Sequence, residues 1–214
     1  MRLTVFGATG GTGKEIVRQA LDAGHQVTAV VRDPARLTVS GDGLEVVTVA
    51  AVTDPASLRP LVAGRDAVLS GIGPTSPRRT GIAEASARAV VRAMEETGTR
   101  RVVTISAAPV GAPAADESAL NKRVLYPLIG RLLKPVYTDL AAMEAELRAS
   151  ALDWTAVRPG NLGDKPFTGH YRRAVGANVP RAGTLGRADL ALAMLECVAD
   201  EGTYKQVVGL GAGG

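Results

Sequence analysis

The sequence predicts an α/β protein in which a central parallel sheet is covered by helices on both faces. Short apolar runs alternate along the chain with stretches that carry apolar residues at helical spacing. The runs are almost continuously apolar, which is typical of parallel strands buried on both faces. The length of 214 residues suits one well-buried core and is short for two independent domains. We therefore expect residues 1–214 to form a single domain, with a small substrate-side portion from about residue 161.

The expected elements follow one another along the whole chain. The expected strands are the apolar runs at residues 3–6, 27–31, 44–49, 67–70, 102–105, 154–157 and 206–208. Helical patterns follow Gly13 as far as Gly24, and others occupy residues 55–62, 82–97, 119–133, 138–150 and 189–198. Pro135 separates the two helices in the middle of the chain. We expect residues 107–116 and most of 161–183 to be loops, and the tail 209–214 to be mobile.

Composition argues against several classes of function. The net charge is +4, but the basic residues are scattered and aromatic residues make up only 3%, so a nucleic-acid surface is not expected. No apolar run approaches the roughly 20 residues of a membrane span, and Gly7 comes too early for a signal peptide, so we expect a cytoplasmic protein. The only cysteine, Cys197, has the apolar setting of a buried thiol. Neither histidine, His25 or His170, lies in a ligand motif, so no metal site is expected.

A glycine-rich segment directly follows the first expected strand and opens the first expected helix. Gly7, Gly10 and Gly13 fit the spacing G-x-x-G-x-x-G, which allows a tight turn and close approach of the backbone to a pyrophosphate. The free N–H groups and positive dipole end of the helix favour phosphate at the same place. This pattern predicts a Rossmann fold, a three-layer αβα sandwich with a central parallel sheet. The residues expected to line the cofactor here are Gly7, Thr9, Gly10, Gly11, Thr12 and Gly13.

The end of the second expected strand indicates which dinucleotide binds. A site for NAD usually has an acidic residue there, whereas this chain has Arg32, with Arg36 one helical turn further on. Two guanidinium groups suit the 2′-phosphate of NADP(H). Two solvated surface arginines would give the same pattern, and Asp33 could bind a ribose hydroxyl, which would admit NADH. The prediction is NADP(H).

Five segments together resemble the NAD(P)H-binding, or NmrA-like, group of atypical short-chain dehydrogenases/reductases, and most of all its biliverdin IXβ reductase/flavin reductase type. The resemblance extends over nearly the whole chain. The segments are residues 6–13, 31–37, 102–106, 163–171 and 187–191.

The resemblance implies further site residues. Gly71, Ile72 and Gly73 would line the cofactor, and Ser106 would face the nicotinamide, although a small residue that lets the backbone approach would serve equally well there. Many relatives have an aspartate near the adenine, where this chain offers only the apolar Val52. The biliverdin-reductase type has a histidine near the substrate, where this chain has Asn161, which can orient an amide or carboxylate but cannot titrate.

The Tyr-x-x-x-Lys pair of typical short-chain reductases is not expected in this chain. Counting back from residues 144–147 and 158–160, which resemble the segments that follow the pair in extended relatives, places its two positions on Val136 and Leu140. Tyr137 is one step away on the helix, and Tyr126 lies on the preceding expected helix, so each remains a candidate proton donor or a pocket-wall residue. Ser118 and Lys122 have the spacing, but serine lacks the acidity of tyrosine.

These observations favour an NADPH-dependent reductase of flavins, quinones or similar planar acceptors, because hydride transfer between two bound rings needs no protein acid. Ser106 and Asn161 would flank the nicotinamide and the acceptor. Lys122, Arg131 and Lys134 could draw anionic substrates or could be solvated surface charges. The alternatives are a non-catalytic NADP(H)-binding sensor and, less favoured by the missing pair, a sugar-nucleotide epimerase. The expected partner is a small-molecule acceptor, and a flavin is one candidate for this substrate. The expected oligomeric state is a monomer or weak dimer.

Overall fold

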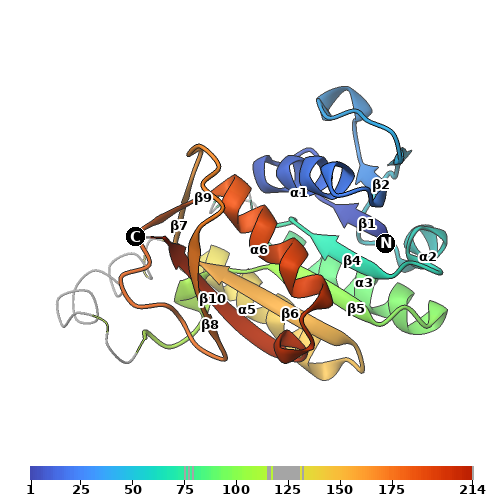
Figure 1. The fold of residues 1–214 in the computed structure, drawn as a ribbon. Coiled ribbons are helices and arrows are strands. Elements are labelled where there is room, and N and C mark those ends of the chain that lie inside the picture. The colour runs from blue at the N-terminus through green and yellow to red at the C-terminus, as the bar shows by residue number, and fades with distance from the viewer. Residues whose placement is uncertain are drawn as a thin grey trace.

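The described part of the computed structural model comprises residues 1–74, 76, 78, 80–114, 117, 131 and 133–213, and its centre is a twisted sheet (Figure 1). All neighbouring strands of this sheet run parallel except β8, which is antiparallel to β10. In spatial order the strands are β3 (Leu44–Thr48), β2 (Gln26–Val31), β1 (Arg2–Phe6), β4 (Ala67–Ser70), β5 (Arg101–Ile105), β6 (Asp153–Pro159), β10 (Gln206–Ala212) and β8 (Tyr171–Val175).

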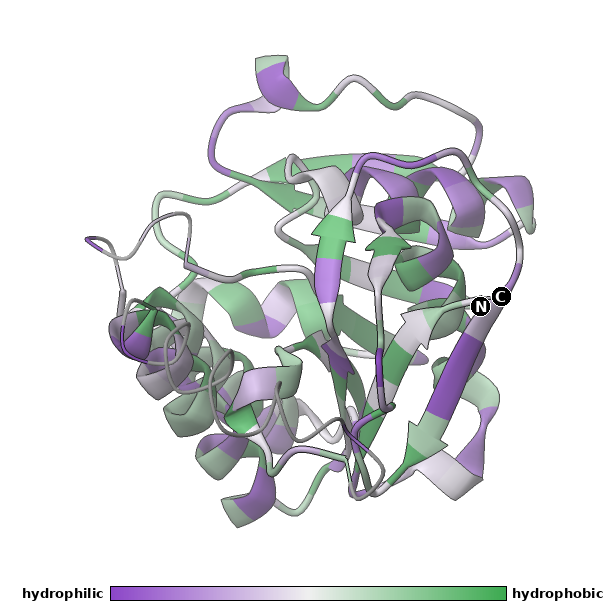
Figure 2. Ribbon diagram, turned by 90° about the vertical axis from the view of Figure 1, so that its left-hand side faces the viewer, coloured by the Kyte–Doolittle hydropathy of each residue, from purple (hydrophilic) through white to green (hydrophobic). Residues whose placement is uncertain are grey.

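Helices cover the two faces of the sheet in separate layers. One face carries α1 (Gly11–Asp22) and α6 (Arg187–Ala199), and the other carries α2 (Pro55–Val62), α3 (Ile82–Thr97) and α5 (Lys134–Ala149). Figure 2 shows hydrophobic colour in the central strands and hydrophilic colour on the outer turns of the helices. These layers and the strand order confirm the predicted Rossmann-type αβα fold.

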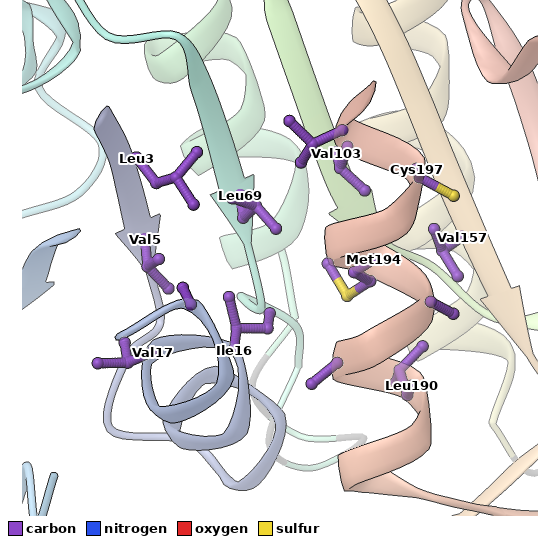
Figure 3. Packing of buried hydrophobic residues seen from close by; sticks show 14 of the residues in the cluster. Leu3, Val5, Ile16, Val17, Leu69, Val103, Val157, Leu190, Met194 and Cys197 are labelled. Atoms are coloured by element: carbon purple, nitrogen blue, oxygen red, sulfur yellow. The ribbon is translucent and has the colours of Figure 1, made fainter. Parts of the chain in front are cut away.

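The apolar spacing of α1 explains how it packs. Ile16, Val17 and Ala20 are fully buried on one face of the helix, and they lie against strand residues such as Val5 and Leu69 (Figure 3). Side chains from α6 complete the same cluster (Figure 3). The two helices therefore share one apolar layer, and their relative position is fixed by it.

Aspartate side chains cap the first turns of two helices. Asp54 accepts hydrogen bonds from the N–H groups of Ala56 and Ser57 at the start of α2. Asp139, on α5, caps α3 instead, because its carboxylate accepts from the N–H groups of Ala83 and Glu84. This contact ties α3 and α5, two of the three helices of this layer, together at the start of α3.

The structure of the second half of the chain differs in detail from what the sequence predicts. The helix expected from residue 138 begins at Lys134, because Pro135 lies in the first turn, where its missing N–H costs nothing. Residues 161–183 are mostly loop, as expected, but they also contain β8 and β7 (Asn161–Gly163), which pairs in parallel with β9 (Thr184–Gly186). Period-two alternation is weak in such short strands, so the sequence did not reveal them.

The tail expected to be mobile is largely ordered sheet. β10 extends to Ala212, and Leu210 within it is 1% exposed. A Cβ on Gly209 would overlap the carbonyl oxygen of Ala177, so this glycine permits close packing of two backbones. The helix expected at 119–133 lies outside the described residues except at its last positions. None of the helices among the described residues is long and apolar enough to cross a membrane.

Candidate functional site

The glycine segment forms the tight junction between β1, α1 and the end of β4. Gly7 has a φ of +72°, a conformation that side chains disfavour, and its carbonyl oxygen accepts from the N–H of Gly10 at 2.9 Å. A Cβ on Gly13 would overlap the carbonyl oxygen of Gly7, and a Cβ on Gly7 would lie 2.9 Å from the carbonyl carbon of Gly71. Only glycines allow these three chain segments to approach so closely.

The N-terminus of α1 is open for a ligand. Its N-cap is Gly10, and no described side chain caps the helix there. The first N–H groups of a helix have no carbonyl in the preceding turn, and the helix dipole makes this end positive. Thr12 is buried and Thr9 is half-buried in the same turn. This cradle fits the pyrophosphate of a dinucleotide, as the spacing of the glycines predicts.

Arg32 and Arg36 lie at the end of β2, where the 2′-hydroxyl or 2′-phosphate of the adenosine ribose binds in this fold. Both are exposed, and Arg36 ends the short 3-10 helix η1 (Pro34–Arg36). Within the described ranges neither arginine has an ion pair, so both are available to an anion. The carboxylate of Asp33 accepts from the N–H of Ala35 at 3.1 Å and caps η1, which occupies one of its oxygens.

The other predicted cofactor residues lie around the end of β4. Gly71 is next to the start of α1, since a Cβ on it would lie 3.5 Å from the nitrogen of Gly13. Ile72 and Val52 are half-buried and pack against the apolar cluster on the face covered by α2 and α3. Gly73 follows directly and is also half-buried. The structure thus brings Gly71 to the glycine segment, while Val52 offers an apolar contact only.

Ser106 follows β5 and is 5% exposed. Its hydroxyl donates to Oε1 of Glu144 at 2.6 Å, and its N–H donates to the carbonyl of Val157. A serine hydroxyl has one proton, so this hydrogen bond uses its only donor and leaves the oxygen as an acceptor. Ser106 is therefore arranged to accept a hydrogen bond, for instance from an amide, rather than to give a proton.

Glu144 is the centre of a buried ion-pair cluster that sequence reasoning did not assign to the site. Its side chain is fully buried and accepts from Nε of Arg158 at 2.7 Å and from one terminal nitrogen of Arg158 at 2.5 Å. Arg148 adds a third bond at 2.5 Å. Burial alone raises the pKa of the Glu144 carboxyl, but the hydrogen bonds from Arg158 and Ser106 outweigh it and hold that pKa below its ordinary value. The two residues lie in the segments 144–147 and 158–160, and only the fold brings them together.

The remaining described candidates lie in β7 and in α5. Asn161 begins β7 with an exposed side chain, in the small parallel pair with β9 rather than in the main sheet. Val136 and Tyr137 are half-buried and Leu140 is buried, all in one apolar cluster with Ala83 and Met143. Burial raises the pKa of Tyr137.

Several candidates cannot be placed in the site. Arg131 and Lys134 are exposed. Tyr126, Lys122 and Ser118 lie outside the described residues. No group of three or more histidine, cysteine, aspartate or glutamate side chains within the described part of the chain could hold a metal ion.

Fold and site together define a dinucleotide-binding protein of the Rossmann class. A family model described as NAD(P)H-binding matches residues 7–201, and the chain belongs to this family. This confirms the predicted family resemblance, the nicotinamide-dinucleotide cofactor and the membership of an oxidoreductase group.

Similar proteins include both curated relatives and solved structures. A (4-alkanoyl-5-oxo-2,5-dihydrofuran-3-yl)methyl phosphate reductase from Streptomyces griseus is 34% identical over 158 residues, which are 73% of this chain but only 46% of that reductase. A short-chain dehydrogenase/reductase from Veillonella parvula in complex with NADP has a TM-score of 0.80 at 19% identity, covering 98% of this chain and 94% of that one. A candidate NADH-flavin reductase from Streptococcus pneumoniae has a TM-score of 0.76 at 22% identity, covering 99% of both. The two structures show the same fold.

Proposed function

We propose that the protein is an NADPH-dependent reductase that transfers hydride directly to a flavin, a quinone or a similar planar conjugated acceptor. Bound NADPH would supply the hydride from its nicotinamide ring, and the acceptor would take the accompanying proton from water. Family membership and the reductases among its relatives support the reaction type. The name of the Streptomyces griseus relative describes an unsaturated lactone, which is also a planar conjugated acceptor.

The observation that carries this proposal is the hydrogen bond from Ser106 to Glu144. It commits the only hydroxyl proton of Ser106 to a carboxylate whose pKa is held low. Val136 and Leu140 are apolar at the positions where a tyrosine and a lysine would be expected. Reduction of an isolated ketone needs a proton donor beside the oxygen, whereas a flavin or quinone does not. The arrangement therefore favours acceptors that stabilise added charge in their own ring system.

The predicted site residues would each bind a different part of the cofactor or the acceptor. The backbone at Gly7, Gly10 and Gly13 would hold the pyrophosphate, and Arg32 with Arg36 would bind the 2′-phosphate. The oxygen of Ser106 would accept from the nicotinamide amide. Asn161, exposed beside β9, would orient the acceptor.

The reaction is tested by following the oxidation of NADPH with FMN, with a quinone, and without an acceptor. We expect at least one acceptor to increase the rate well above the background. If NADPH binds tightly and neither acceptor increases its oxidation, the reductase proposal is wrong. The apolar Val136 and Leu140 would then favour the second candidate, a non-catalytic NADP(H)-binding sensor.

Cofactor preference is tested with Arg32→Ala. Loss of a charged hydrogen bond should weaken NADPH binding by about 1.5–3 kcal/mol and leave NADH binding nearly unchanged. Titration with each dinucleotide measures the two dissociation constants. Arg18→Ala is the matched control, because Arg18 is an exposed arginine on α1 that pairs with Glu15 and Asp22. Equal losses for NADPH and NADH would show that Arg32 does not bind the 2′-phosphate.

A further inference from the structure

Arg187, the first residue of α6, lies against the start of α1. A Cβ on Gly11 would be 2.7 Å from Cδ and 3.0 Å from Nε of Arg187, so the absence of a side chain at Gly11 makes room for this arginine. Gly11 is the first residue of α1 and part of the glycine segment. The guanidinium therefore lies over the turn that faces the pyrophosphate.

The position of Arg187 is fixed by the surrounding structure. Gln19 of α1 donates to the carbonyl of Ala188 in the first turn of α6 at 2.8 Å. Asp189 in the same turn accepts from the N–H groups of Thr168 and Gly169, each at 2.9 Å. The first turn of α6 is thus anchored to α1 on one side and to the segment before β8 on the other. Apolar side chains of α1 and α6, such as Ile16 and Leu190, belong to one buried cluster (Figure 3).

The charges around Arg187 favour a bound anion. The guanidinium is next to the positive and uncapped end of α1, and two positive groups repel each other there. Among the described residues its ion-pair partner is Asp164, whose carboxylate is 2.5 Å away but 90% exposed. Exposed ion pairs stabilise proteins by only about 0–1 kcal/mol. A doubly charged pyrophosphate at the glycine segment would satisfy the guanidinium and the helix end together.

We propose that Arg187 is a pyrophosphate ligand of the bound dinucleotide. The glycine segment supplies N–H groups from one side, and the guanidinium supplies charged donors from the other. Arg32 and Arg36 follow β2, where the ribose is bound in this fold, whereas Arg187 is beside Gly11, where the pyrophosphate is bound. This inference rests on the dinucleotide site of the proposed function, but not on the reduction of any acceptor.

The test measures dissociation constants of NADPH and NADH without an acceptor, so its result is independent of whether the protein reduces flavins or quinones. Both dinucleotides contain the pyrophosphate, and only NADPH contains the 2′-phosphate. Arg187→Ala should weaken both by the same factor, about 10- to 100-fold, and Arg187→Lys should restore part of the loss. An unchanged affinity, or a loss confined to NADPH, would overturn the proposal.

Two further variants separate binding of the phosphate from a structural role. Asp164→Asn removes the ion pair but keeps the guanidinium, so the affinity should stay within about twofold of wild type or increase. If Asp164→Asn reproduces the loss seen with Arg187→Ala, the pair is structural and the proposal is wrong. Arg173→Ala is the matched control, because Arg173 forms a similar exposed pair with Asp200. It should bind both dinucleotides as wild type does.

A double-mutant cycle tests whether Gly11 and Arg187 act together. Gly11→Ala should displace the arginine side chain and weaken both dinucleotides, and this loss should be much smaller when Arg187 is already alanine. Circular dichroism spectra of all variants check that the fold is kept. Equal losses from Gly11→Ala in both backgrounds would contradict the proposed contact between the guanidinium and the pyrophosphate.

Discussion

Arg101 and Arg158 are both buried arginines on neighbouring strands, yet they lie at opposite ends of the sheet and are neutralised differently. Arg101 begins β5, and its guanidinium donates to the main-chain carbonyls of Cys197, Val198 and Asp153. It also lies 4.5 Å from the ring centre of Tyr204. Arg158 is near the end of β6, and its guanidinium forms two hydrogen bonds with the carboxylate of Glu144.

The difference separates a structural end of the sheet from the end that carries the site. Carbonyl dipoles at the C-terminus of α6 solvate Arg101 without a bonded carboxylate, and burial lowers its pKa. At the other end a full negative charge faces Arg158, and its oxygens have lone pairs left over for Ser106. An ionisable carboxylate is thus kept where a cofactor would bind, whereas the guanidinium at the opposite end is bonded to main-chain carbonyls and to the hydroxyls of Thr155 and Thr203.

The largest expected effect comes from breaking the ion pair at the site end. Glu144→Ala leaves Arg158 buried without its counter-charge and should lower the free energy of unfolding by about 3–5 kcal/mol. Urea denaturation measures this. Glu146→Ala is the control, because Glu146 pairs with the exposed Arg88 and should cost no more than about 1 kcal/mol. Equal costs for the two variants would contradict a strongly coupled pair.

A smaller loss is expected at the structural end. Arg101→Met keeps most of the buried volume but removes the guanidinium donors that the carbonyls of Cys197 and Val198 accept from, which should cost about 2–3 kcal/mol. NADPH affinity should not change, because these bonds are at the end of the sheet opposite the glycine segment. Arg100→Met is the control, since Arg100 is exposed and pairs with Asp153. A large loss of NADPH affinity in Arg101→Met would mean that the two ends are coupled.

The smallest expected effect is a difference in pH dependence between the two ends. The pKa of the Glu144 carboxyl in the folded protein is below its value of about 4.3 in the unfolded chain. The ionised carboxylate therefore contributes its full stabilisation above the unfolded-state pKa, and this stabilisation is lost as the pH falls through the folded-state pKa. The stability difference between wild type and Glu144→Gln should therefore shrink as the pH is lowered from 6 towards about 3. The corresponding difference for Arg101→Met should change far less, because its main bonds are to carbonyls. Urea denaturation across this range compares the two, and parallel curves would show that Glu144 does not titrate in this way.

Much of the candidate site was predictable where the physical cause is local. The spacing identifies Gly7, Gly10 and Gly13, because a phosphate-binding turn between a strand and a helix needs glycine at those positions. Arg32 follows an apolar strand directly, and Arg36 comes four residues later. The sequence singled out the segments that contain Glu144 and Arg158, but not the two residues themselves. Nothing along the chain indicates that a helix residue and a strand residue 14 positions apart form a buried pair that also contacts Ser106.

The sequence by itself determined the strands of the first half, the phosphate turn and the absence of a tyrosine and a lysine at positions 136 and 140, because apolar runs, glycine spacing and side-chain identity act within a few residues. The tertiary structure decided what these residues face. It placed Arg187 over Gly11, committed the hydroxyl of Ser106 to Glu144, and packed Gly209 against Ala177 in a strand expected to be mobile. These contacts join residues that are far apart along the chain, and burial and charge at such contacts are set only when the layers pack together.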